Sequence, residues 1–222
     1  NFSAYALGIL PNSLGSTVSA APGSAGHSIG QLLAKSTTLQ TLSLKGNKLN
    51  DTDTIALAEG LAENASLSSL DLSNNEIGSG SASALATILL RSELKEINLE
   101  WNKLQNQGAA TLIKEGLPVT NVKRIFLAWN GLGDEAAEQL GKVMIGSSTI
   151  EEIDLSNNHI GPKGAEQLAK GIRVSMALAI LVIHDNPLRD EGCSALLRAI
   201  AENQTLNIVD MRSTGAGKGS AE

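Results

Sequence analysis

The sequence predicts an α/β solenoid, in which short parallel strands form a concave sheet and helices cover the convex side. Two observations support this fold class. Asparagines recur every 27 or 28 residues after a first interval of 35, each with apolar residues at fixed offsets. Two large apolar residues follow most of these asparagines at the i, i+4 spacing of a buried helix face. The asparagines are Asn12, Asn47, Asn75, Asn102, Asn130, Asn158 and Asn186.

The first half of each period predicts a strand and a turn. Apolar residues stand five and three positions before each asparagine, as in the pair Ile153 and Leu155. Because side chains alternate along a strand, both members of such a pair point to the same side, into the core. We expect the asparagine amide to be buried and to bond backbone groups of its own turn and the adjacent turn.

The second half of each period predicts a helix. Leu168 and Ile172 are one of the i, i+4 pairs, and small residues such as Gly164 and Ala165 precede them. A small residue allows a helix to approach its neighbour closely. One unit cannot bury its apolar residues alone, so the units must stack side by side. Helices are wider than strands, and the stack therefore curves with the strands inside.

The repeats define a single domain over residues 1–216, with about eight repeats of 28 residues. The first repeat carries extra residues over 15–26, a segment rich in Ser, Gly and Ala that we expect to form a loop. The last repeat, 206–216, is degenerate because Thr214 replaces the asparagine. No helix is predicted after Met211, so we expect the last strand to be partly bare and to favour self-association through this end. Residues 217–222 are expected to be a loose tail.

Composition excludes several classes of protein. The 222 residues carry a formal net charge of −6, which argues against a nucleic-acid surface. The longest apolar run, residues 176–183, is far shorter than the ~20 residues of a membrane-spanning helix. The single cysteine, Cys193, excludes an internal disulfide framework and favours a reducing, cytoplasmic location.

Several segments carry a resemblance to a known family. The pattern L-x-L-x-x-N-x-L, seen in Ile-Asp-Leu-Ser-Asn-Asn-His-Ile at 153–160, resembles the leucine-rich repeats of the ribonuclease-inhibitor type. Residues 129–131 and 186–193 are similar to the leucine-rich repeat-containing protein 74 group. The resemblance covers residues 7–211 and implies a horseshoe fold and a role in binding another protein.

The positions six, four, two and one before each asparagine are expected to face the concave side. Trp101 and Trp129 occupy the same position in adjacent repeats, and their strands should lie ~4.8 Å apart. Phe126 lies on the same face. Exposed tryptophans are typical centres of protein-binding surfaces. The alternative is that the two rings pack on each other and only cover the sheet.

The concave positions are also rich in charge, with seven acidic and three basic residues. A curved surface of one sign attracts an oppositely charged partner, so a protein with a basic surface is predicted. The alternative is a solvated face that keeps the sheet soluble. The residues predicted to contact the partner are Trp101, Trp129, Phe126, Glu96, Glu100, Arg124, Glu152, Asp154, Asp71, His184 and Asp185.

No group of residues predicts catalysis, a metal site or a cofactor, because the three histidines fall in different repeats. We therefore predict a non-enzymatic protein-binding scaffold without a membrane or nucleic-acid partner. Three alternatives remain open. The first is a regulator of a small GTPase, which would depend on Arg124, the only central concave base. The second is an enzyme inhibitor that resembles the ribonuclease inhibitors, which are acidic and bear tryptophan on the concave face but are longer and rich in cysteine. The third is a segment of a larger innate-immune receptor.

Overall fold

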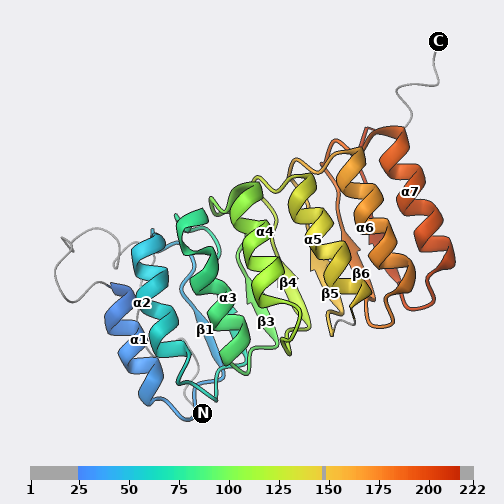
Figure 1. Ribbon diagram of the computed structural model, residues 1–222. Helices are drawn as coiled ribbons and strands as arrows, with labels where there is room; N and C mark the ends of the chain where they lie inside the picture. Colours follow the sequence, from blue (N-terminus) through green and yellow to red (C-terminus); the bar gives the residue numbers. More distant parts are fainter. Residues whose placement is uncertain (1–24, 147–148, 216–222) are drawn as a thin grey trace.

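The computed structural model describes residues 25–146 and 149–215. The predicted strand and turn around Asn12 and the predicted tail 217–222 lie outside these residues. Helices and strands alternate regularly through the described chain (Figure 1). The helices are α1 (Ala25–Lys35), α2 (Asp51–Leu61), the short 3-10 helix η2 (Ser79–Ser81), α3 (Ala82–Arg91), α4 (Gln105–Gly116), α5 (Asp134–Ile145), α6 (Pro162–Val174) and α7 (Arg189–Glu202). The strands are β1 (Thr41–Ser43), β2 (Ser69–Asp71), β3 (Glu96–Asn98), β4 (Arg124–Phe126), β5 (Glu152–Asp154), β6 (Ile180–Val182) and β7 (Ile208–Asp210).

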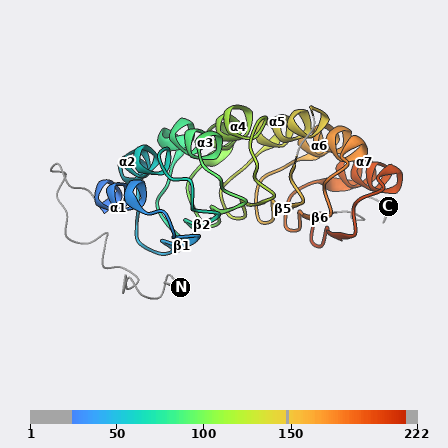
Figure 2. The same cartoon turned by 90° about the horizontal axis from the view of Figure 1, so that it is seen from below.

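All described strands belong to one parallel sheet, in the order β1 to β7. Equivalent residues pair between neighbours, so that Ile97, Ile125 and Ile153 lie side by side. Figure 2 shows the helices along the outer side of an arc and the strands along its inner side. The predicted α/β solenoid, with its sheet on the concave face, is therefore confirmed.

The core between the two layers is aliphatic. The inward strand residues Leu127 and Leu155 have exposed fractions of 0 and 1%, and the helix pair Leu168 and Ile172 is fully buried. These residues stand at the predicted positions of their repeats. The register predicted from the asparagine spacing is thus the register of the sheet.

The repeat asparagines form a buried ladder, as Asn158 illustrates. Its Nδ2 donates to the carbonyls of Leu155 in the same turn and Leu127 in the preceding repeat, at 2.9 and 3.0 Å. Its Oδ1 accepts from the N–H groups of Asn130 and Leu132, at 3.1 and 2.9 Å. One side chain therefore satisfies four backbone groups that no strand pairing reaches.

Close contact between helices depends on glycine. A Cβ built on Gly171 of α6 would lie 2.5 Å from the carbonyl oxygen of Gly141 in α5. The two helices thus pack backbone against backbone. The loop predicted over 15–26 is wrong at its last two residues, which are helical, while 15–24 lie outside the described residues. Ala25 and Gly26 belong to α1 and are buried. Gly26 packs so closely on the next repeat that a Cβ on it would strike the backbone of Asp53.

The last repeat is less well covered than the others. Val209 and Met211 are only partly buried, whereas the equivalent Leu181 and Ile183 are fully buried. Thr214 replaces the ladder asparagine; its hydroxyl donates to the Met211 carbonyl at 3.0 Å and lies 3.2 Å from Cys193 Sγ. Self-association through this end stays a prediction. None of the described helices is both long and apolar enough to cross a bilayer.

Candidate partner-binding surface

The turn that follows each strand requires an unusual backbone conformation. Trp101 and Trp129, each directly before a ladder asparagine, have φ angles of 54° and 58°. This left-handed region is favourable for Gly and tolerated by Asn and Asp, and it is unusual for a bulky side chain. The equivalent residues of the other described repeats also have positive φ, and they are Gly46, Asn74, Asn157, Asp185 and Ser213. The fold therefore favours small or polar residues at the two positions that carry tryptophan.

The two indole rings stack on each other. Their centroids lie 4.3 Å apart and their planes are inclined by 16°. Each backbone N–H donates to the next repeat, from Trp101 to Ala128 and from Trp129 to Ser156. After stacking, Trp101 and Trp129 still expose 54 and 45% of their surface. The predicted adjacency is thus confirmed, and so is the packing of the rings on each other, but an aromatic surface remains in solvent.

A bond that the sequence analysis missed stabilises several turns. The side-chain oxygen of Asp154 accepts a hydrogen bond at 2.8 Å from the N–H of Ser156, two residues later. Asp71 braces Ser73 in the same way, and its second oxygen accepts from the Ser43 hydroxyl at 2.9 Å. Asp71 and Asp154, both predicted as partner contacts, therefore also serve their own turns. The signal was present in the sequence as a repeated Asp or Asn four residues before the ladder asparagine.

Phe126 stands at this bracing position in β4. It pairs in register with Asn98 and Asp154, and it has no oxygen to offer the N–H two residues later. Phe126 is partly exposed on the same face as the tryptophans. The repeat of β4 thus departs from the favoured residue type at both Phe126 and Trp129. We define Trp101, Phe126 and Trp129 as the aromatic patch.

Charge around the aromatic patch is predominantly acidic. Arg124 lies between Glu96 and Glu152 in the register, and its Nε donates to Glu96 Oε2 at 2.7 Å. Glu100 lies directly before Trp101 and is partly exposed. The one central base is therefore compensated by its neighbour, and the remaining carboxylates give this part of the surface a negative charge.

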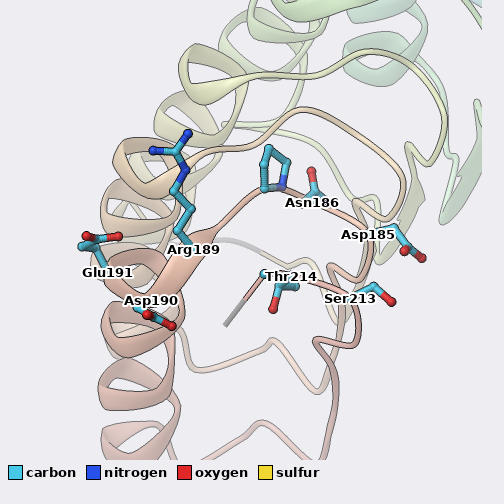
Figure 3. A pocket seen from close by; sticks show the side chains of 9 residues that line it. Asp185, Asn186, Arg189, Asp190, Glu191, Ser213 and Thr214 are labelled. Atoms are coloured by element: carbon cyan, nitrogen blue, oxygen red, sulfur yellow. The ribbon is translucent and has the colours of Figure 1, made fainter. Parts of the chain in front are cut away.

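The predicted contacts His184 and Asp185 lie further along the arc, after β6. His184 Nδ1 and Asp185 Oδ2 are 2.7 Å apart. Asp185 also lines an open cavity of about 650 Å³ between the last turn and the start of α7. Figure 3 shows Asp185 and Ser213 on the turns of this cavity and Arg189, Asp190 and Glu191 on the helix side. Trp129 follows β4 and Asp185 follows β6, with β5 between them, so His184 and Asp185 are not part of the aromatic patch.

A cluster of metal ligands would be another kind of functional site. Within 25–146 and 149–215, no group of three or more His, Cys, Asp or Glu side chains is placed to hold a metal ion. Cys193 is buried in α7, as expected from its small-residue position.

Comparison with known proteins agrees with this architecture. A family model described as Leucine Rich repeat matches residues 35–58, 63–86, 93–112 and 146–169. The fold is that of a leucine-rich repeat solenoid. The finer grouping with leucine-rich repeat-containing protein 74 stays a prediction, and a search of curated proteins gave no match.

Two solved structures are similar to this chain at low identity. The tropomodulin C-terminal domain of Caenorhabditis elegans is 15% identical, with a TM-score of 0.50, over 78% of this chain and 89% of that chain. Leiomodin-1 Actin-Binding Site 2 is 18% identical, with a TM-score of 0.49, over 59% of this chain and 76% of that chain. At 15% identity the similarity to the tropomodulin domain concerns the fold alone.

Proposed function

We propose that this chain is a non-enzymatic interaction module that binds a partner protein on its concave face, with the aromatic patch at the centre. The observation that supports this proposal most is the Trp101–Trp129 stack, which stays half exposed on a left-handed backbone. A leucine-rich repeat solenoid presents its sheet as an extended, rigid surface, so a partner can be bound without rearrangement of the fold. The single, buried thiol of Cys193 supports a reducing, cytoplasmic location.

The energetic argument begins with the cost of the tryptophans. A left-handed conformation costs a residue with a side chain roughly 1–2 kcal/mol, a penalty that Gly in the same turn avoids. Strained or unfavourable residues tend to lie where function requires them. Tryptophan is also the residue type most enriched among interface positions whose truncation costs ~2 kcal/mol or more. Binding energy from a partner that covers both rings would offset the conformational cost of the two tryptophans.

Capture experiments with a variant that preserves the turn test the proposal. Asparagine occupies the equivalent positions at Asn74 and Asn157, so Trp101→Asn with Trp129→Asn suits the left-handed backbone. Immobilised wild type and this double variant are exposed to an extract of the source cells, and bound proteins are quantified by mass spectrometry. We expect proteins bound by wild type to be lost from the double variant.

The matched control is Leu197→Gln. Leu197 is 58% exposed on α7, on the convex side, so it is as exposed as the tryptophans but far from the concave face. This variant should retain all wild-type partners. Identical binding by the double variant and wild type would refute the proposed role of the aromatic patch.

The structure offers less support for the alternative of a GTPase regulator. An arginine that acts on a phosphoryl group must be free to approach it. Arg124 instead donates to Glu96 at 2.7 Å. The interaction module is therefore the function that the geometry favours.

A further inference from the structure

A second apolar area lies on the concave face, over β6 and β7. Ile180 and Ile208 pair in register, and Val182 lies two residues after Ile180 on the same side of β6. We define these three residues as the aliphatic patch. Ile208 exposes 54% of its surface, and Ile180 and Val182 are partly exposed.

The other strands carry polar residues at the positions of the aliphatic patch. The residues equivalent to Ile180 and Ile208 in β1 to β5 are Thr41, Ser69, Glu96, Arg124 and Glu152. Val182 occupies the position where Asp71 and Asp154 brace their turns, and it cannot accept that hydrogen bond. The other strands therefore form with polar residues at these positions, so the fold does not require apolar residues there. Contiguous exposed apolar residues are typical of a contact surface.

The aromatic and aliphatic patches lie within reach of one extended peptide. Trp129 follows β4 and Val182 lies in β6, two strands further along the sheet. Two strand spacings give roughly 10 Å across the sheet, and three residues along a strand give a further ~10 Å. The diagonal is therefore ~14 Å, which four to five extended residues span.

The carboxylates near both patches define the charge of the partner. Glu152 pairs in register with Ile180, and Asp154 pairs with Val182. Glu100 lies beside Trp101 in the sequence. A guanidinium group combines a planar surface that stacks on indole with donors for carboxylates, so arginine meets both demands, and lysine meets them less completely.

We propose that the concave face binds an extended segment of a partner protein that carries two anchors. One is an arginine or lysine that contacts the aromatic patch. The other is an aliphatic side chain, four to five residues away, that contacts the aliphatic patch. This inference rests on the proposed function, because it names the partner chemistry of the same concave face.

Selection from a display library of random 12-residue peptides tests the inference. The targets are wild type, the Trp101→Asn/Trp129→Asn variant, the Ile180→Thr/Ile208→Thr variant and the Leu197→Gln control. Threonine is the native residue at the equivalent position of β1, so the isoleucine substitutions suit a strand. Affinities of selected peptides are then measured by fluorescence anisotropy of labelled peptides.

We expect wild type to enrich peptides in which Arg or Lys is spaced four to five residues from Leu, Ile, Val or Met. Each double variant should weaken their binding at least tenfold, and Leu197→Gln should leave it unchanged. Because Trp101 and Trp129 are the two tryptophans of the chain, wild-type tryptophan fluorescence should also change on binding.

The possible failures separate the two proposals. Peptides without the spaced pair, no enriched peptide at all, or binding that ignores the isoleucine substitutions would overturn the two-anchor inference. If the same peptides still depend on the tryptophans, the proposed function stands. Binding that ignores both tryptophan substitutions would overturn the inference and the proposed function together.

Discussion

Asp134 Oδ1 accepts a hydrogen bond at 2.7 Å from the N–H of Gly161, the residue that caps the N-terminus of α6. Asp134 itself belongs to the first turn of α5, so one repeat caps the helix of the next. Asn106 makes the same contact with Gly133, at 3.0 Å, and Asp51 makes it with Gly78, at 2.6 Å. A second polar ladder therefore joins the repeats on the helix side, in addition to the buried asparagines on the strand side.

Loss of this cap should destabilise the protein moderately. We expect Asp134→Ala to lower the free energy of unfolding by about 1 kcal/mol, because a helix N-terminal N–H loses its acceptor. Glu135 is adjacent and exposed, and Glu135→Ala is the control, with an expected change below ~0.5 kcal/mol. Urea denaturation followed by circular dichroism measures both. Equal stability of the two variants would show that the contact between repeats contributes nothing.

Loss of a ladder asparagine should lower the free energy of unfolding more than loss of the Asp134 cap. Asn158→Ala leaves the N–H groups of Asn130 and Leu132 without their acceptor. The Leu155 and Leu127 carbonyls lose one donor each but are still reached by the neighbouring ladder asparagines. Buried groups left unpaired cost ~1–3 kcal/mol each, so we expect the two unpaired N–H groups to cost at least ~2 kcal/mol in total. The neighbouring Asn157→Gly keeps the left-handed turn and should change stability by less than ~1 kcal/mol. The same unfolding measurement compares them, and a similar effect of both substitutions would contradict the ladder.

The close contact between α5 and α6 predicts that alanine substitution destabilises the protein at Gly171 and not at Gly146. Ala favours a helix over Gly by about 1 kcal/mol, yet we expect Gly171→Ala to destabilise, because its Cβ would lie 2.5 Å from the Gly141 carbonyl oxygen. The expected loss is ~1–3 kcal/mol. Gly146→Ala is the control, because its Cβ would meet no atom closer than 3.5 Å. Thermal melting should lower the midpoint of the first variant alone, and an unchanged midpoint would exclude such close packing.

The exposed ion pair of Asp210 and Arg212, at the end of the sheet, predicts a lowered pKa for Asp210. Hydrogen bonding from Arg212 lowers the pKa of Asp210 from its ordinary value of 3.8 to about 2. A depressed pKa in the folded state means that the contribution of Asp210 to stability is present above pH ~4 and is lost as the pH falls through ~2. This contribution is small, because the pair is in solvent.

Carboxyl NMR titration of Asp210 checks this value. The pKa should return towards 3.8 in Arg212→Gln, while the same substitution at the distant Arg198, exposed on α7, should leave it low. A wild-type midpoint near 4 would show that the pair does not form in solution.

The sequence predicted the solenoid, its register and the adjacency of the two tryptophans, because all three follow from one period. It did not predict the bond between Arg124 and Glu96, although these residues stand at the same position of adjacent repeats. The Asp154 brace and the Asp134 cap were missed for a different reason. Each depends on one side chain pointing toward a backbone N–H, and the spacing of apolar residues carries no information about that orientation. The left-handed turn had a signal in Gly46, Asn74 and Asn157, and its consequence for Trp101 and Trp129 became clear only from the φ angles.

The central claim is that Trp101 and Trp129 are maintained for binding and are dispensable for the fold. Equilibrium urea unfolding of Trp101→Asn/Trp129→Asn, followed by far-ultraviolet circular dichroism, tests it most directly. We predict a free energy of unfolding within about 2 kcal/mol of wild type, because relief of the left-handed strain offsets the lost stacking. Two buried aromatic residues would cost ~6 kcal/mol or more on truncation. A loss of that size would show that the tryptophans are part of the core and would contradict the account.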